Sequence, residues 1–318
     1  MSTKIGCDIL AAADILRRGG LVAIPTETVY GLAADARNLD AVKKVYQVKQ
    51  RPANHPVIVH LAEARWAKHW AESLSQDFWT LAAELWPGPL TMIVQRHPSV
   101  PDLITGGQTS IALRVPAHPL TLELLGKLGR SLVAPSANRF GRISPTSAEH
   151  VAADLDGDVG YVLDGGPCEV GLESTILDLT CSPARILRPG RVTRETLARF
   201  LPLGDGPSEV RAPGTLAQHY APTCPAYRID AGELKRDLGD KLGLLSHSPA
   251  ELGFSPLRHL SLPEDPLEYA HGLYSSLRLL EQASPRAIVI QNVPETSEWE
   301  AVADRIRRAT QPWSDQSL

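Results

Sequence analysis

The stretch LVAIPTETVYGL, residues 21–32, joins a short apolar run to a dense group of polar side chains. Residues 21–24 follow a Gly-Gly pair and have the composition of a buried strand. Pro25 ends that strand, and three hydroxyl groups and one carboxylate follow within six residues, before Gly31 lets the backbone turn again. One polar side chain is enough to cap a loop, so the stretch is either a capped loop or a ligand-binding loop.

Helix and strand patterns alternate along the first 201 residues, which predicts an α/β fold. We expect strands at 21–24, 56–61, 90–94, 110–115, 131–134, 160–163 and 174–179, and helices at 8–18, 39–49, 75–86, 119–128 and 147–155. Some of these strands follow one another with too few residues for a helix between them. The sheet is therefore expected to be mixed, with parallel and antiparallel pairs.

The pattern stops between Leu201 and Pro225, where five prolines and three glycines occur. This composition is typical of a domain boundary. Strands at 226–229, 242–246 and 287–290 and helices at 266–283 and 297–309 then predict a second, smaller α/β domain of Rossmann-like type. We expect a first domain at 1–204, a linker or lid at 205–225, and the small domain at 226–318.

Composition and charge argue against a nucleic-acid-binding protein, a disulfide-stabilised protein and a membrane protein. The chain has 318 residues, 43% of them hydrophobic, and a net charge of −4. Residues 1–205 carry 21 basic and 21 acidic side chains, so charge does not indicate nucleic-acid binding. Four scattered cysteines without a C-x-x-C pair suit reduced thiols. No apolar run approaches membrane-spanning length and no signal-peptide core is present, so we expect a cytoplasmic protein without membrane contact.

Two positions carry cations in settings that suit an anion. Lys49 and Arg51 lie one residue apart at a predicted helix end, in a turn restricted by Pro52. They either complement the helix dipole or converge on a polyanion. Arg114 alternates with apolar residues on a predicted strand, so it either points to solvent or is buried with a carboxylate or phosphate in its planar fork.

Small hydroxyl and amide side chains follow two further strands. Ser136 and Asn138 leave one strand, and Ser174 enters another after a glycine turn. Such groups let a ligand approach the backbone closely, although they also form ordinary turns. Arg188 is followed by Pro189-Gly190, which rules out a helix and places this arginine at a strand end.

The common phosphate and metal motifs are absent from the sequence. It contains no G-x-x-x-x-G-K-[ST] or G-x-G-x-x-G loop, no H-E-x-x-H or C-x-x-C pattern, and no G-x-S-x-G elbow. Any nucleotide must therefore be bound by dispersed Lys, Arg, Ser and Asn side chains, and no protein metal site is expected.

Together these motifs resemble the YrdC-like family, and more closely its long-form threonylcarbamoyl-AMP synthases, which carry an additional C-terminal domain. The motifs are Pro25–Leu32, Lys49-x-Arg51, Pro56–Leu61, Ser110–Pro116, Pro135-Ser136-x-Asn138, Ser174-Thr175-Ile176 and Arg188-Pro189-Gly190, with His219-Tyr220-Ala221-Pro222 in the linker. The resemblance covers residues 8–201 in order. It implies a twisted mixed-sheet YrdC-like domain and the synthesis of L-threonylcarbamoyl-AMP and pyrophosphate from L-threonine, bicarbonate and ATP.

The resemblance also implies which residues bind which substrate. L-threonine is assigned to Thr28, His60, Arg114, Ala134 and Ser174. ATP is assigned to Lys49, Arg51, His55, Ser110, Ser136, Asn138, Ser144, Arg188 and Tyr220, with Lys49 and Arg51 as the catalytic residues. Asn54 is the alternative to His55 as the residue that contacts ATP at this position. The family usually has a basic residue between Pro-Gly and His-Tyr, whereas this linker reads Thr-Leu-Ala-Gln there.

Mg²⁺ is implied as the companion of ATP, and a tRNA threonylcarbamoyl transferase complex as the recipient of the product. The modified base would be the adenosine next to the tRNA anticodon. One alternative is an RNA-binding or ribosome-associated module, which leaves weak RNA contact possible. Another is a carbamoyl transferase, but the additional zinc-finger and acylphosphatase modules of those proteins are absent.

Overall fold

The computed structural model describes residues 3–206, 208–216, 218–247 and 251–314, so linker positions 207 and 217 lie outside it. The chain divides into two compact units. The first comprises residues 1–140, 145–169 and 173–215, and the second comprises residues 141–144, 170–172 and 216–318. The predicted linker is thus shared, since residues 205–215 belong to the first unit and residues 216–225 to the second.

The first unit is built on a ten-stranded sheet with the order β1-β8-β2-β3-β7-β4-β6-β5-β9-β10. Its strands are β1 (Lys4–Gly6), β2 (Val22–Ile24), β3 (Gly31–Asp35), β4 (Ile58–His60), β5 (Leu90–Gln95), β6 (Ser110–Arg114), β7 (Leu132–Val133), β8 (Tyr161–Leu163), β9 (Thr175–Asp178) and β10 (Arg185–Arg188). Pairs such as β4 with β6 are parallel, and pairs such as β5 with β6 are antiparallel. The prediction of a mixed α/β sheet is confirmed.

The helices of the first unit are α1 (Ile9–Arg17), α2 (Leu39–Lys49), η1 (Ala64–His69), α3 (Gln76–Leu85), α4 (Asp102–Thr105), α5 (Pro119–Leu128), α6 (Ala148–Leu155) and α7 (Arg194–Ala198). Helices α1, α2, α3, α6 and α7 begin at polar caps that the sequence provides. Asn38, for example, caps α2 by accepting the backbone N–H groups of Asp40 and Ala41. The buried Val42, Val45 and Tyr46 then lie on one face of that helix.

The expected turn at Gly31 is wrong, because this residue begins β3. Gly31 pairs with Ile24 of β2 and forms a bridge to Ser136. A Cβ atom at this position would lie 3.0 Å from the Cβ of Ala134 and 3.2 Å from its carbonyl oxygen. Glycine is therefore needed for close approach of two backbones rather than for a turn.

The central strands present two faces of different character. Val59 of β4 and Leu113 of β6 point into the main hydrophobic core, beneath the helices. Ile58 and Ala112 point to the opposite face, in a small cluster that includes Ala212 of the linker. Since side chains alternate along a strand, Ser110, His60 and Arg114 share this second face. The first part of the linker therefore lies on the face that carries the predicted site residues.

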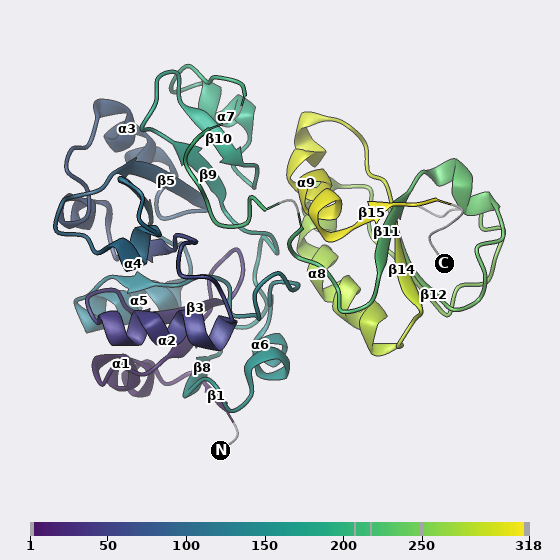
Figure 1. Ribbon diagram of the computed structural model, residues 1–318, viewed down its shortest axis with the longest axis horizontal. Coiled ribbons are helices and arrows are strands. Elements are labelled where there is room, and N and C mark those ends of the chain that lie inside the picture. The colour runs from purple at the N-terminus through teal and green to yellow at the C-terminus, as the bar shows by residue number, and fades with distance from the viewer. Residues whose placement is uncertain (1–2, 207, 217, 248–250, 315–318) are drawn as a thin grey trace. The chain divides into compact units, whose positions relative to one another are not determined.

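The second unit has a parallel sheet with the order β13-β12-β14-β11-β15. Its elements are β11 (Ala226–Ile229), η2 (Ala231–Lys235), β12 (Leu242–Ser246), β13 (Arg258–Ser261), α8 (Pro266–Gln282), β14 (Ala287–Gln291), η3 (Ser297–Trp299), α9 (Glu300–Ala309) and β15 (Gln311–Pro312). Helices α8 and α9 pack on this sheet (Figure 1). The predicted final helix is shorter than expected, because its first three residues form a 3₁₀ turn.

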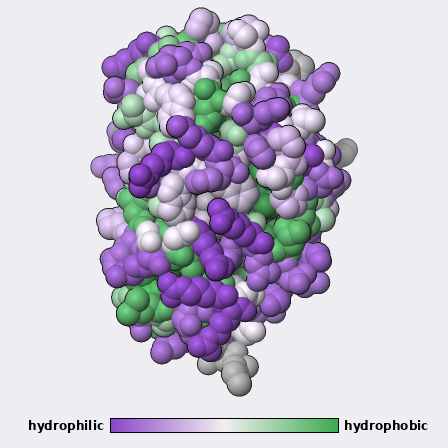
Figure 2. All heavy atoms as spheres, turned by 90° about the vertical axis from the view of Figure 1, so that its left-hand side faces the viewer, coloured by the Kyte–Doolittle hydropathy of each residue, from purple (hydrophilic) through white to green (hydrophobic). Residues whose placement is uncertain are grey.

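No helix among the described residues is long and apolar enough to cross a membrane. On the face drawn in Figure 2, hydrophilic and hydrophobic residues alternate in small groups. The four cysteines Cys7, Cys168, Cys181 and Cys224 are free, in agreement with the expectation of reduced thiols.

Candidate active site

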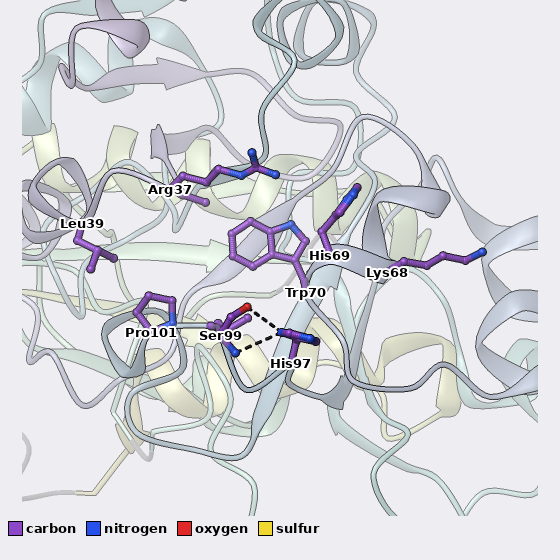
Figure 3. A pocket seen from close by; sticks show the side chains of 10 residues that line it. Arg37, Leu39, Lys68, His69, Trp70, His97, Ser99 and Pro101 are labelled. Carbon is purple, nitrogen blue, oxygen red and sulfur yellow. Dashed lines mark hydrogen bonds between the residues drawn. The ribbon is translucent and has the colours of Figure 1, made fainter.

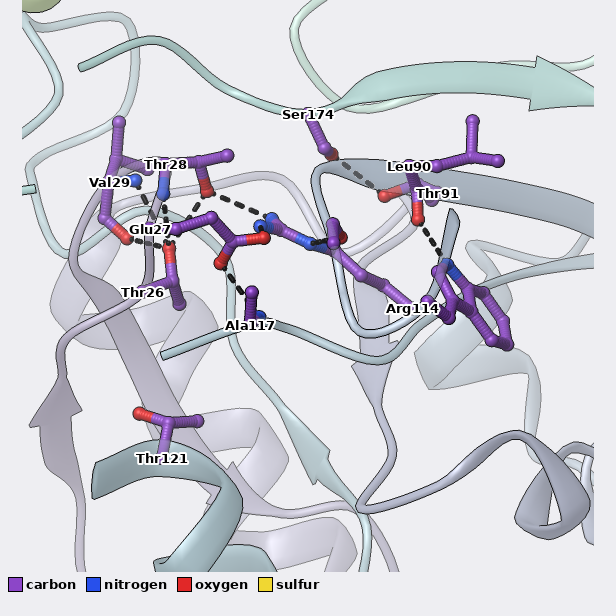
Figure 4. Close-up of polar contacts among 12 residues, drawn as sticks. Thr26, Glu27, Thr28, Val29, Leu90, Thr91, Arg114, Ala117, Thr121 and Ser174 are labelled. Atoms are coloured by element: carbon purple, nitrogen blue, oxygen red, sulfur yellow. Dashed lines mark hydrogen bonds and ion pairs between the residues drawn. The ribbon is translucent and has the colours of Figure 1, made fainter. Parts of the chain in front are cut away.

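The guanidinium group of Arg114 lies at the centre of a buried polar cluster (Figure 4). Its Nε donates to the carbonyl oxygen of Gly88 at 3.2 Å, and its Nη1 donates to Oγ1 of Thr28 at 2.9 Å. Nη2 lies 2.7 Å from Oε1 of Glu27, but neither atom has an aligned hydrogen-bond partner in the described part of the chain. This contact is an ion pair, and Nη2 retains donor capacity for a second carboxylate.

The polar stretch after β2 folds as a tight turn around Thr26. Oγ1 of Thr26 accepts the backbone N–H groups of Thr28 and Val29, both at 3.1 Å, and donates to the carbonyl oxygen of Val29. Glu27 is fixed at its other oxygen, which accepts the backbone N–H of Ala117 at 3.1 Å. The turn thereby directs one carboxylate and one hydroxyl group toward the guanidinium (Figure 4).

His60 lies beside this arginine as a neutral imidazole. It ends β4, where it is paired in register with Arg114, and it is buried. Burial, and then the positive charge of Arg114, lower the pKa of His60 to about 3. Its Nδ1 has no hydrogen-bond partner among the described residues. A buried ring nitrogen of this kind suits a hydroxyl or amine of a ligand.

Ser174 is held from two sides at the entry to β9. Its Oγ lies 2.8 Å from Oγ1 of Thr91, and its carbonyl oxygen accepts Nε and Nη2 of Arg188 at 3.0 and 2.9 Å. Gly190 packs against the same segment, where a Cβ atom would lie 2.5 Å from the backbone nitrogen of Thr175. The motif around Arg188 therefore positions Ser174 as well as presenting a cation.

Lys49 ties the end of α2 to the loop after β7. Its Nζ donates to the carbonyl oxygens of Ser136 and Asn138, at 2.5 and 2.7 Å. Burial, followed by the charge of Arg51, lowers the pKa of Lys49 well below its usual value. The lysine thus sets the conformation of the Ser-Ala-Asn loop that the sequence resemblance assigns to ATP.

Arg51 lies on the ring of Phe140. Its guanidinium carbon is 5.6 Å from the ring centroid, and its Nη2 donates to the carbonyl oxygen of Pro56 at 2.6 Å. The imidazole of His55 stands 5.3 Å from the same ring, edge-on. Burial, and then the charge of Arg51, lower the pKa of His55, whereas Asn54 is exposed.

Two predicted site residues with small side chains, Ser110 and Ala134, also lie in the first unit. Ser110 begins β6, four residues before Arg114, so both side chains are on one face of that strand. Ala134 follows β7 and donates its backbone N–H to the carbonyl oxygen of Ile58 at 3.3 Å. The predicted threonine and ATP residues of the first unit therefore occupy adjoining strands and loops.

The first part of the linker packs on the site face. Val210 and Ala212 join the small apolar cluster on that face, and the carbonyl oxygen of Pro213 accepts Nη1 of Arg188 at 2.9 Å. Gln108 fixes this part of the linker further, because its side chain forms hydrogen bonds with the backbone N–H and carbonyl of Arg211. Residues 208–215 thus form an ordered strap.

Ser144 and Tyr220 belong to the second unit. Tyr220 has a positive φ of 62°, which is uncommon for an aromatic residue. Its ring lies 5.9 Å from that of Tyr274, and the guanidinium carbon of Arg305 stands 5.2 Å from its centroid. These contacts fix the His-Tyr motif in one conformation within the unit.

Comparison with known proteins accounts for both units. The family model Sua5_yciO_yrdC, described as telomere recombination, matches residues 14–190, and a model for the threonylcarbamoyl-AMP synthase C-terminal domain matches residues 192–311. The chain is 34% identical to the threonylcarbamoyl-AMP synthase of Pyrococcus abyssi, over 95% of this chain and 94% of that protein. The chain belongs to the threonylcarbamoyl-AMP synthase family. The Bacillus subtilis threonylcarbamoyl-AMP synthase is 36% identical, over 95% of this chain and 92% of its own length.

A solved member of the family has the same fold. The crystal structure of P. abyssi Sua5 complexed with L-threonine superposes with a TM-score of 0.86 and 33% identity, over 97% of both chains. This agreement confirms the α/β architecture with two sheets. The chain is accordingly an enzyme of the threonylcarbamoyl-AMP synthase family.

Sequence reasoning assigned no role to two residues of the buried cluster. Glu27 belongs to the opening motif, but its partner Arg114 is distant along the chain. Thr91 lies in the apolar run of β5. A buried hydroxyl group needs a hydrogen-bond partner, so a threonine in this apolar run is itself a signal of a polar neighbour, which is Ser174. In this synthase-family chain, Glu27 and Thr91 support the arginine and the serine that would contact substrate.

Because His60 is neutral in the folded protein, we expect the free energy of unfolding to depend on pH. An unfolded histidine has a pKa near 6.5, and the folded value is about 3, so between these values the unfolded chain binds more protons. The free energy of unfolding should therefore fall by roughly 1 kcal/mol for each pH unit as pH decreases through this window. Chemical denaturation of His60→Gln at several pH values should show a flatter profile. His69→Gln, at an exposed histidine, should keep the wild-type slope, and equal slopes in all three proteins would contradict the assignment.

Proposed function

We propose that this enzyme makes L-threonylcarbamoyl-AMP from L-threonine, bicarbonate and ATP, with release of pyrophosphate. The observation that carries the proposal is the buried fork of Arg114, whose Nη2 keeps donor capacity beside Nδ1 of His60, which has no hydrogen-bond partner within residues 3–206, 208–216, 218–247 and 251–314. A family member has been crystallised with L-threonine. The proposed site combines one anion receptor with several hydroxyl groups, which suits an amino acid.

The residues around Arg114 would hold threonine in an orientation for reaction. Nη2 would receive its carboxylate, while Thr28, His60 and Ser174 would contact its amine and hydroxyl groups. The backbone near Ala134 would line the same pocket. The amine nitrogen then forms a bond to the carbon of carbon dioxide derived from bicarbonate, and releases a proton to give a carbamate. Such chemistry depends mainly on positioning, and no covalent nucleophile is required.

ATP would lie against the loop that Lys49 organises. Arg51, His55, Ser110, Ser136, Asn138, Ser144, Arg188 and Tyr220 would contact the nucleotide, with Lys49 and Arg51 as the catalytic residues. A carbamate oxygen attacks the α-phosphorus, and the bond to pyrophosphate breaks. The cations would neutralise charge that develops on the phosphate oxygens.

Mg²⁺ would arrive with ATP and neutralise part of the phosphate charge. The described residues contain no group of three or more His, Cys, Asp and Glu that could hold a metal ion. The donor set therefore fits an ion held by phosphate oxygens and water rather than by the protein. The product would pass to a tRNA threonylcarbamoyl transferase complex, for modification of the adenosine next to the anticodon.

The proposal predicts that pyrophosphate release requires both threonine and bicarbonate. Purified enzyme supplied with ATP and Mg²⁺ should release pyrophosphate only when both are present, because the carbamate is the nucleophile. L-serine, which lacks the methyl group of threonine, should serve as a poorer substrate. Pyrophosphate release that is indifferent to either substrate would contradict the proposed reaction.

A further inference from the structure

A second pocket lies in the first unit, away from the candidate active site. It has a volume of about 490 Å³, within the range of small-molecule sites. Its walls come from the chain after β3, the end of η1 and the loop between β5 and α4. Leu39, which begins α2, lines it, whereas Lys49 of the candidate active site ends the same helix about 15 Å further along.

Four of the residues that line this pocket can carry positive charge, and none of the others is acidic. They are Arg37, Lys68, His69 and His97, all exposed to solvent. Figure 3 shows Arg37, His69 and His97 around the indole of Trp70, whereas the side chain of Lys68 extends away from it. The indole is held in one orientation at the base of the pocket, because its Nε1 donates a hydrogen bond to Oγ of Ser131 at 3.0 Å.

Nearby carboxylates do not neutralise these cations. Asp35 pairs with Arg130, Asp40 with Lys43, Glu63 with Arg65, and Asp102 with Arg96. Neither Arg37 nor Lys68 forms an ion pair with any residue that the structure describes. The pocket therefore has an uncompensated positive charge, close to the positive end of the α2 dipole.

His97 contributes an oriented donor. Its Nδ1 accepts the backbone N–H of Ser99 at 3.2 Å and lies 2.7 Å from the hydroxyl of the same residue. An accepting Nδ1 places the proton of the neutral ring on Nε2. The loop is held in place because the backbone nitrogen of His97 donates to the carbonyl oxygen of Trp70 at 2.8 Å.

The pocket is apolar at its other end. Figure 3 shows Leu39 and Pro101 on one side of the Trp70 indole, and Lys68 and His69 on the other. A ligand that fills it must combine a multiply charged anionic group with a compact body of low polarity. A nucleoside phosphate has this form, because its phosphates suit the basic end and its base suits the apolar end.

We propose that this pocket binds a nucleoside phosphate at a site separate from the active site. Bound nucleotide would place its phosphates among Arg37, His69 and His97. The inference does not depend on the proposed reaction, since the pocket shares no residue with the site assigned to threonine and ATP.

Equilibrium dialysis with a radiolabelled, non-hydrolysable ATP analogue tests this proposal, without threonine or bicarbonate. We expect two sites per wild-type chain. The double variant Arg37→Ala/His97→Ala should lose one site, or bind there about tenfold or more weakly, because two charge-assisted contacts disappear. Lys127→Ala, an exposed base outside the pocket that pairs with Glu123, is the control and should keep both sites. Unchanged binding in the double variant would overturn the proposal.

Arg51→Ala separates this site from the active site. In that variant the pocket should remain the main binding site, and inorganic triphosphate should bind to it about tenfold more weakly than the nucleotide, since it cannot use the apolar end. Equal affinities would overturn the nucleoside part of the proposal. If the wild-type protein binds nucleotide at one site only, and Arg51→Ala loses that site, the proposal for the pocket is wrong and the assignment of ATP to Arg51 stands. One site that survives in Arg51→Ala and is lost in the double variant supports the pocket and contradicts the assignment of ATP to Arg51.

Discussion

Replacing Arg114 by lysine is expected to lower kcat/KM for threonine about a thousandfold, through the loss of roughly 4 kcal/mol of charged hydrogen bonds. Lysine keeps a positive charge beside Glu27, but it lacks the planar fork that reaches Gly88, Thr28 and a substrate carboxylate at once. Substitution by alanine is a poorer test. It would leave the buried Glu27 carboxylate without a counter-charge, at a cost of about 3–5 kcal/mol in stability.

The matched control is Arg130→Lys. Arg130 also pairs with a buried carboxylate, that of Asp35, at 2.6 Å, but lies outside the candidate site. We expect nearly wild-type kinetics from this variant. Threonine KM and kcat, ATP KM and the thermal unfolding midpoint should be measured for both. If Arg114→Lys retained wild-type kcat/KM for threonine, the carboxylate would be bound elsewhere.

Replacing Lys49 by methionine is expected to reduce kcat about a thousandfold, comparable to the removal of a preorganised donor from an active site. The side chains have similar length, but methionine cannot donate to the carbonyl oxygens of Ser136 and Asn138. Each carbonyl left buried without a donor costs about 1–3 kcal/mol, so the loop should adopt another conformation. Nucleotide binding should weaken as a consequence.

Lys43→Met tests whether any lysine of α2 would behave in this way. Lys43 is exposed on the same helix and pairs with Asp40 at 3.0 Å. Its replacement should leave kcat, KM for ATP and stability nearly unchanged. Wild-type turnover in Lys49→Met, with a folded protein shown by circular dichroism, would remove Lys49 from the catalytic assignment.

Periodicity located most elements of the first unit within a few residues, and α2 and α5 coincided with their predicted bounds. Strand β3 was not predicted, because Gly-Leu-Ala-Ala-Asp has little strand propensity and is stabilised by pairing with β2 and β7. The second α/β domain was also predicted correctly. Its edge strands β13 and β15 were not predicted, since β13 is polar and β15 has only two residues.

The amino-acid sequence alone determined the α/β class, the two-part chain, the family resemblance and the identity of the cations and hydroxyl groups. These follow from local patterns, where neighbouring residues carry the signal. Only the tertiary structure decided that Glu27 faces Arg114, that Thr91 meets Ser174, and that Lys49 binds carbonyl groups. Each of these pairs joins residues more than 80 positions apart, whose contact depends on strand order and register, and no local pattern encodes that order.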